Sequence, residues 1–455
     1  MIENIYYMVF DVVPTEQNQE YNNIESAEAY CWIKSTDVDS SYIIATFFIE
    51  KSDFIIKKNT QKPIVVIEDN FINREIELEN FYIAQKEKRS FLYIAESKSV
   101  TIPTKIKLQS SYKFDMSKFL LKAEELSKDG RCLHYQANAR CDEIIKAHSI
   151  QKNRVLSKIA NKNKEIYALS KNMSDSKKND GNLSFRKYPI SKFSIFRGFC
   201  GTHDNQLFEP IDNLYFQSEN KQHIFLYAYR SLAKELFDKE NSLYLKREML
   251  KDMKDNIGLF NSMSNDISGI ENACNSLNIH KKIYDNVLEN ETYDDMRYVT
   301  FNSTDKFFMA FSNILYPEYD FNGNLLQDLS DTTKTFDLIT FYLAPTETGW
   351  SFVFSWHKSS DNSCLAFIQS LKLKIQEGSI LGDLLFKFIL LNSENFAFSP
   401  IWWESLSQDK RKEISQSITN MMQPTIAIRE HYLMNGLTGI SNWDFKTENN
   451  NLNVR

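Results

Sequence analysis

The sequence predicts an α+β protein of several domains, and three observations support this fold class. The chain has 455 residues, of which 42% are hydrophobic and 25% charged, enough for two to four domains of ordinary globular composition. Extended apolar segments near both ends are separated by a long stretch with helical periodicity. Six of the thirteen cysteines and histidines lie between residues 132 and 203. We therefore predict a small α/β domain at 1–98, a Cys/His-containing module at 115–215, a helical region at 220–292, an α+β domain at 293–440 and a flexible tail at 441–455.

In the N-terminal domain, three segments are rich in β-branched and aromatic residues, which predicts strands. They are residues 4–13, 29–35 and 62–69. Residues 41–51 are compatible with either a helix or an extended segment. The domain is therefore expected to be a small α/β unit.

The Cys/His-containing module begins at 118–130, where apolar spacing and a terminal glycine predict a short helix. Ser149 is expected to cap a second helix, because Val155, Leu156 and Ile159 would share one helical face. Residues 181–199 are alternating and aromatic. That pattern predicts strands, and these could pair as a hairpin.

The remaining regions follow the same reasoning. Residues 220–292 keep a helical spacing throughout, whereas residues 296–357 predict strands. Residues 362–420 return to a helical pattern. The polar C-terminal segment is expected to be loose.

The cysteines and histidines predict a metal site. Cys200 and His203 form a C-x-x-H pair, and Cys132 and Cys141 supply two further thiols. A structural zinc site takes four such ligands in a tetrahedron, so we predict that these four residues bind one Zn²⁺. His134 could replace one of the first two cysteines. Alternatively, those two cysteines are ordinary buried apolar residues.

A basic segment lies inside an acidic chain. The net charge is −6, yet residues 146–197 hold thirteen Lys or Arg and three Asp or Glu, a local charge of +10. Such a segment is typical of a phosphate-binding surface, although a solvated lysine-rich loop gives the same count. The predicted nucleic-acid contacts are Lys146, Lys152, Arg154, Lys158, Arg186, Lys187 and Arg197.

His148 lies close to both the cysteines and the basic residues. Phosphodiester cleavage needs a base that is neutral near pH 7, and it needs cations to stabilise charge on the phosphate oxygens. Histidine suits the first role and arginine the second. We therefore predict His148 as a general base and Arg154 as a catalytic cation.

Two polar residues follow His203 directly. Asp204 and Asn205 are expected at the start of a short helix that ends before Pro210. They could hold a Mg²⁺ ion or cap that helix. We include both among the candidate catalytic residues.

This order of residues resembles the HNH, or ββα-metal, nucleases, which are built on a treble-clef zinc frame. The resemblance covers about residues 130–212 and implies that His148 is the general base and that Cys200 and His203 form the second knuckle. It places Asp204 or Asn205 on the metal side of the following helix. The chain departs from the family in having eight residues between its first two cysteines, His203 in place of a cysteine, and Asp204 in place of the last histidine.

More widely, the chain resembles zinc-finger ribonuclease effectors of bacterial antiphage defence. That resemblance implies a homo-oligomer, a viral protein as trigger, and RNA as substrate. RNA is favoured because its 2′-hydroxyl can act as nucleophile without a catalytic metal. The alternatives are an HNH-type DNA endonuclease that uses Mg²⁺, a non-enzymatic zinc-stapled module that binds nucleic acid or protein, and a structural scaffold.

The sequence predicts a cytoplasmic protein with no membrane partner. Residues 1–10 lack the basic and apolar regions of a secretory signal. The most apolar run, at 380–391, contains Asp383 and Lys387 and is too short to span a bilayer.

Overall fold

The computed structural model describes two compact units, residues 1–109 and 110–455. It describes residues 3–97, 122, 125–126, 129–170, 183–252, 257–422 and 430–452. Within these ranges, short gaps fall at 19–20, 22–23, 72–74, 139–140, 142, 330 and 332–333. The predicted helix at 118–130 falls largely outside these residues. The chain is a mixed α+β protein, which confirms the coarse fold class.

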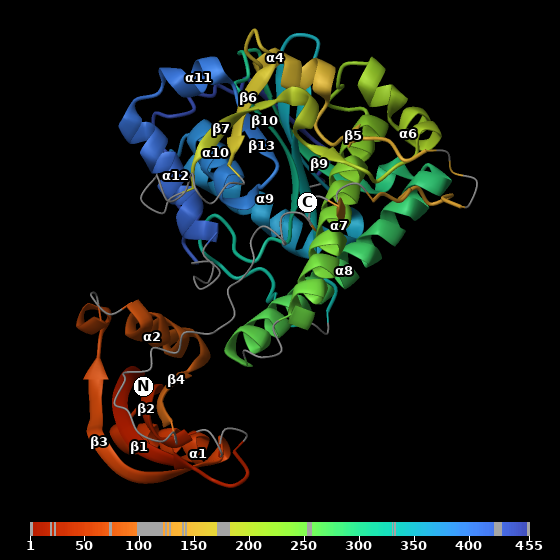
Figure 1. Cartoon of the computed structure of the whole chain (residues 1–455). Helices are drawn as coiled ribbons and strands as arrows, with labels where there is room; N and C mark the ends of the chain where they lie inside the picture. The colour runs from red at the N-terminus through yellow and green to blue at the C-terminus, as the bar shows by residue number, and fades with distance from the viewer. Residues whose placement is uncertain are drawn as a thin grey trace. The chain divides into compact units, whose positions relative to one another are not determined.

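The first unit is a four-stranded antiparallel sheet with a helix on each face (Figure 1). Met8 and Phe10 of the first strand pack on the side of helix α1, and Ile5 and Tyr7 pack on the side of α2, because successive side chains of a strand point to opposite faces. The order across the sheet is β3 (Phe54–Val66), β1 (Asn4–Pro14), β2 (Ile24–Ser35) and β4 (Arg89–Ser97). The helices are α1 (Val38–Lys51), η1 (Glu68–Phe71) and α2 (Glu75–Glu87).

Residues 41–51, which the sequence left open, belong to helix α1. Asp37 caps this helix, since its carboxylate accepts a hydrogen bond from the Ser40 backbone N–H at 2.8 Å. Capping of this kind satisfies one of the free N–H groups of the first turn. The Asp37 cap therefore favours a helix in a segment whose apolar pattern fits either a helix or a strand.

The second unit is built on an eight-stranded antiparallel sheet. The strands, in order across the sheet, are β14 (Thr447–Asn450), β9 (Met296–Ser303), β12 (Trp350–His357), β11 (Ile339–Pro345), β10 (Met309–Leu315), β13 (Phe396–Phe398), β6 (Glu165–Leu169) and β7 (Phe185–Pro189).

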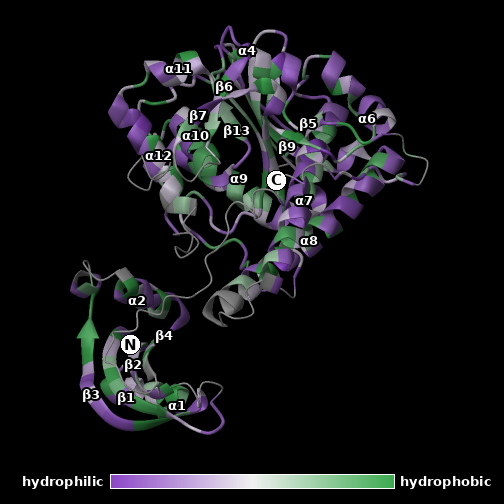
Figure 2. Cartoon of the chain, viewed as in Figure 1, coloured by the Kyte–Doolittle hydropathy of each residue, from purple (hydrophilic) through white to green (hydrophobic). Residues whose placement is uncertain are grey.

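Helices cover both faces of this sheet (Figure 1). Tyr342 and Val353 pack in one core with helix α7, while Phe341 and Phe354 pack in the opposite core with α9 and α10. Figure 2 shows hydrophobic residues along α10 and mainly hydrophilic residues along α12. The helices are α7 (Lys221–Asp252), α8 (Ile257–Asn290), η4 (Tyr293–Asp295), η5 (Lys358–Ser360), α9 (Asp361–Gln376), α10 (Leu381–Asn392), α11 (Pro400–Ser405) and α12 (Gln408–Met422).

A smaller arrangement beside α7 carries most of the predicted site. Its two-stranded antiparallel sheet pairs Ala147 with Phe196 and His148 with Ile195, and Phe196 and Ala147 pack in the same core as α7. Its elements are β5 (Ala147–His148), the π-helical turn η2 (Lys152–Leu156), α4 (Ser157–Ile159), η3 (Ile190–Lys192), β8 (Ile195–Phe196) and α6 (Gly201–Asn213).

The structure corrects three expectations from the sequence. Residues 181–199 form no hairpin, because β7 pairs with β6 in the large sheet and β8 pairs with β5 in the small one. The regions predicted at 115–215, 220–292 and 293–440 pack together as one unit. Within the predicted flexible tail at 441–455, Thr447–Asn450 form an edge strand on β9, where backbone hydrogen bonds hold a polar segment without burying it.

None of the helices in the described part of the chain is long and apolar enough to cross a membrane.

Candidate metal centre and the residues around it

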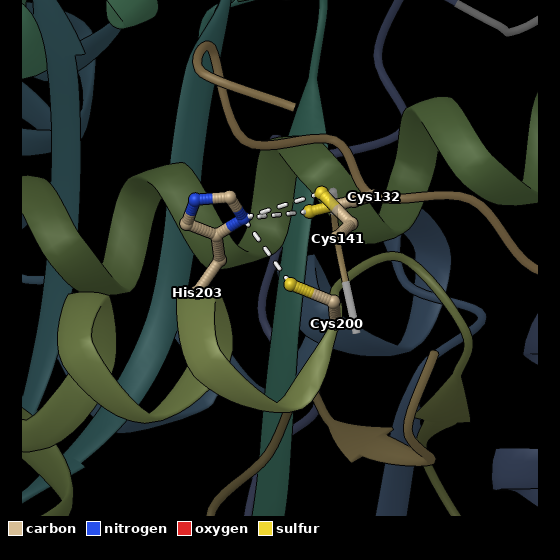
Figure 3. A group of neighbouring side chains, drawn as sticks. All are labelled: Cys132, Cys141, Cys200 and His203. Carbon is tan, nitrogen blue, oxygen red and sulfur yellow. Dashed lines mark hydrogen bonds between the residues drawn. The ribbon is translucent and has the colours of Figure 1, made fainter. Parts of the chain in front are cut away.

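Cys132, Cys141, Cys200 and His203 come together in the second unit. One donor atom from each of the four lies within 4.8 Å of the other three. The three sulfur atoms lie 3.3, 3.7 and 3.2 Å from Nδ1 of His203, in chain order, and point toward it (Figure 3). Zn–S and Zn–N bonds of about 2.3 and 2.05 Å give a tetrahedral S···N edge of about 3.6 Å. The spacing of these atoms therefore suits a single tetrahedral ion.

Helix α6 supplies two of the four side chains. Cys200 is its N-cap residue and His203 lies in its first turn. The positive end of the helix dipole favours a thiolate at this position. The C-x-x-H spacing thus places both donors on one side of a helix start.

The other two cysteines lie on a segment that is hydrogen-bonded along the strand leading into α6. The Leu133 and Ile145 backbone N–H groups donate to the carbonyls of Gly198 and Phe199 at 2.8 and 3.0 Å. Gly130 permits this approach, since a Cβ there would lie 2.5 Å from Cγ2 of Ile144. Backbone pairing therefore brings two distant stretches of chain to one centre.

His134, the alternative ligand, lies beside the cluster instead of within it. Its ring stacks on that of His203, with centroids 4.2 Å apart and planes 5° apart. Its Nδ1 accepts a hydrogen bond from the Gln136 backbone N–H at 3.2 Å. Burial, followed by the neighbouring His203, lowers the pKa of His134 to about 4. The donor set is therefore three cysteines and His203.

Side chains of helices α7 and α8 contact the cysteine segment. The Tyr229 hydroxyl lies 3.3 Å from the Leu133 carbonyl and 2.6 Å from Oδ1 of Asp285. The Lys281 ammonium pairs with Asp285 at 2.5 Å and lies 4.8 Å from the Tyr229 ring centre. Burial lowers the pKa of Lys281 and raises that of Tyr229. A cation beside the cluster suits a donor set that carries three thiolates.

His148 lies at the end of β5, half-buried against β8. Its Nδ1 is buried and has no hydrogen-bond partner among the described residues. Burial lowers the pKa of His148, as does the Lys152 ammonium, and the Phe193 carbonyl opposes them. The imidazole is therefore neutral near pH 7 and able to accept a proton.

Asp204 and Asn205 occupy the first turn of α6. The capping role considered for Asp204 is wrong, because Cys200 is the N-cap residue. The Asp204 side chain is half-buried, and its Oδ1 is buried with no partner among the described residues. Burial raises the pKa of Asp204. Asn205 is exposed. The helix also continues through Pro210 to Asn213, beyond the end that the sequence predicted.

Arg154 makes a contact that the sequence did not suggest. Its guanidinium donates to the Asn213 carbonyl at the C-terminal end of α6 and lies 4.4 Å from the Tyr215 ring centre. A side chain used in this way satisfies a free carbonyl at a helix end. Its predicted catalytic and phosphate-binding roles stay predictions.

The other predicted nucleic-acid contacts fall in two places. Lys146, Lys152 and Lys158 are exposed beside the small sheet, whereas Arg186 and Lys187 lie on β7, an edge strand of the large sheet. Lys187 pairs with Glu404 at 2.8 Å, and Arg197 donates to the Ile144 carbonyl at 3.4 Å. Of these residues, Lys152 is the one whose charge acts on His148.

A buried polar group that the sequence did not suggest lies next to these residues. Arg230 of α7 binds Asp212 of α6 through two hydrogen bonds of 2.9 and 2.8 Å. Gln151 donates to the Ile211 carbonyl and, at 3.4 Å, to the same Asp212 carboxylate. The available signal was an arginine inside the apolar run 224–233, since a buried arginine needs an acidic partner.

No protein-family model, curated protein or solved structure matches the chain.

Proposed function

We propose that the chain is a zinc-stapled nuclease that cleaves phosphodiester bonds, with RNA as the favoured substrate and His148 as the general base. One observation carries the proposal. Two of the four Cys/His donors lie at the start of the helix that follows a two-stranded sheet, and the first strand of that sheet ends in His148. The His148 Nδ1 has no partner among the described residues.

The donor set favours zinc as the ion. Three thiols and one imidazole suit Zn²⁺ better than the oxygen-preferring Mg²⁺ or Ca²⁺. When bound, Zn²⁺ would hold the two halves of the knuckle together, with all four positions filled by protein. The role proposed for it is therefore structural.

The chain's own residues would do the chemistry. Neutral His148 would take the proton of a 2′-hydroxyl as that oxygen attacks the adjacent phosphorus. The bond from phosphorus to the 5′-oxygen of the next nucleotide would break, leaving a 2′,3′-cyclic phosphate, and the departing 5′-oxygen would take a proton from water. Lys146 and Lys152, exposed on either side of His148 in the sequence, would attract the phosphate and stabilise its developing charge. This route needs no catalytic metal, which supports RNA over DNA for a chain with Asp204 in place of the last histidine of the HNH pattern.

The test compares the purified chain with His148→Ala on RNA, on DNA of the same sequence, and on RNA with 2′-O-methyl groups. We expect cleavage of RNA alone, lost in the variant while its zinc content stays unchanged. Cleavage of DNA in Mg²⁺ would point to the HNH-type endonuclease. Unchanged cleavage by His148→Ala would exclude His148 as the base.

A non-enzymatic binding module is the second candidate, favoured by the exposed Lys146, Lys152 and Lys158, which need no catalytic group to bind phosphates. Arg154, Lys187 and Arg197 contact protein groups, so part of the basic segment serves the fold. Salt-dependent nucleic-acid binding with no cleavage would support this candidate.

The resemblance to antiphage effectors adds two proposals, self-assembly and activation by a viral protein. We expect oligomers in solution by mass photometry, and cleavage that rises when a trigger is added. A monomer with full activity alone would contradict both.

A further inference from the structure

Arg230 is the most deeply buried charged side chain near His148. It is 3% exposed, and its guanidinium lies 4.0 Å from the ring centre of Phe208. Both of its terminal nitrogens are used by Asp212, whose side chain is 44% exposed. A buried arginine with one half-exposed partner is a weak way to gain stability. A role beyond stability is therefore worth testing.

A continuous chain of hydrogen bonds connects Arg230 to the segment that carries His148. Oδ1 of Asp212 accepts from Arg230 at 2.9 Å and from Gln151 at 3.4 Å. Gln151 also donates to the Ile211 carbonyl. Only two residues separate Gln151 from His148. The position of Asp212, which Arg230 fixes, therefore fixes one end of the segment 148–151.

The residues between His148 and Gln151 are held from the other side. Ser149, which the sequence placed as a helix N-cap, instead donates its backbone N–H to the Ser194 carbonyl at 2.9 Å and shares a hydroxyl contact of 2.5 Å with Ser194. Asn395 donates to the Ser149 hydroxyl at 2.9 Å. With Ser149 held on one side and Gln151 on the other, the backbone after His148 has little freedom.

We propose that Arg230 is a positioning residue for His148. Arg230 acts through Asp212 and Gln151 to fix the His148 imidazole where it meets the substrate. The inference rests on the proposed nuclease function. Arg230 itself, almost fully buried, touches neither substrate nor reacting atoms.

The charge of Arg230 gives a second readout. Apart from its own burial, the groups that act on His148 are Lys152 of η2, the Phe193 carbonyl before β8, and Arg230 of α7. Arg230 lowers the pKa of His148. Loss of this positive charge, which also leaves Asp212 unneutralised, should therefore raise that pKa.

The experiment uses the full-length chain and three variants that separate charge from geometry. Arg230→Met removes the charge. Arg230→Lys keeps the charge but loses the pair of hydrogen bonds to Asp212. Gln151→Met removes only the hydrogen bonds from Gln151 to Asp212 and to the Ile211 carbonyl. Arg247→Met is the matched control, because Arg247 lies on the same helix in an ion pair with Glu271. For each, kcat and KM are measured against pH, and His148 is titrated by NMR of ¹³C-labelled histidine, with His148→Ala to assign its signal.

We expect kcat to fall at least about tenfold in all three variants with little change in KM, as for a misplaced catalytic group. The His148 pKa should rise in Arg230→Met alone, because only this variant removes the positive charge that lowers it. Arg247→Met should change neither quantity.

Two results would overturn the inference. One is a folded Arg230→Met protein with wild-type kcat and an unchanged His148 titration. The other, decisive if Arg230→Met does not fold, is full activity in Gln151→Met. Should the wild-type chain cut no nucleic acid, the proposed function fails, and the NMR titration still decides whether Arg230 controls His148.

Discussion

Loss of one metal ligand should release the cysteine segment and leave the rest of the second unit folded. The perturbation is Cys200→Ser, with His203→Ala as a second form of the same change. The segment between Gly130 and Ile145 has about 13 described residues, and ordering them takes roughly 13 kcal/mol at about 1 kcal/mol each. Against this stand mainly backbone hydrogen bonds and the metal, beside the Tyr229 contact and the packing of Leu133 on the core around α7.

The backbone contribution is small. Four hydrogen bonds connect the segment to the strand leading into α6, worth about 4 kcal/mol together. A structural zinc ion contributes about 10 kcal/mol or more. The hydrogen bonds and the metal together roughly offset the free-energy cost of ordering the segment, whereas the hydrogen bonds alone do not. Without it, the segment should open while the aromatic cores on either side of the large sheet persist.

Zinc content by mass spectrometry and hydrogen exchange measure this directly. In Cys200→Ser we expect loss of the ion and fast exchange of the Leu133 and Ile145 amides, with protection kept in β11 and β12. Cys274→Ser, a change of a buried cysteine on α8 outside the cluster, should alter neither. Retention of one zinc per chain by Cys200→Ser and His203→Ala, or full protection of the segment after zinc loss, would refute the reasoning.

Three further predictions concern packing, pH and charge. Gly130→Ala should lower the free energy of unfolding by about 1–3 kcal/mol, measured by thermal unfolding, because its Cβ would meet Ile144 and Arg197 at 2.5 and 2.6 Å. Gly269→Ala, with open space around it in α8, should raise the free energy of unfolding by about 0.5–1 kcal/mol. The acid limb of kcat against pH should lie below 6.5, since neutral His148 is the active form and burial lowers its pKa; a midpoint above 6.5 would contradict this. Lys152→Ala should weaken nucleic-acid binding and reduce the salt slope by about 1, whereas Lys57→Ala, exposed in the first unit, should not.

The four ligands could be found from the sequence because thiols and imidazoles are scarce in this chain and rarely gather without a reason. The structure brings together the same four residues, Cys132, Cys141, Cys200 and His203. His134 could not be excluded from spacing alone. Only the stacking of its ring on His203 places it outside the donor set.

The end of α6 could not be predicted, because tertiary contacts override a local signal there. Pro210 removes a backbone donor and usually ends or bends a helix. In the structure Gln151 and Arg154 donate to carbonyls of its last turn, and Ile211 is buried. These partners lie about 60 residues away in the sequence. The local sequence around Pro210 therefore cannot indicate where the helix ends.

The same reasoning explains why the polar group around Arg230 was missed and why it matters. Both ends of α6 are tied down by distant side chains, the first turn by the cysteine segment and the last by residues 151–154 and Arg230. His148 lies on the strand between those two attachments. A helix held at one end can pivot, whereas one held at both ends keeps a fixed relation to the sheet beside it. The metal cluster holds only one end of α6, and the hydrogen bonds of Asp212 with Arg230 and Gln151 hold the other end beside the segment that carries His148.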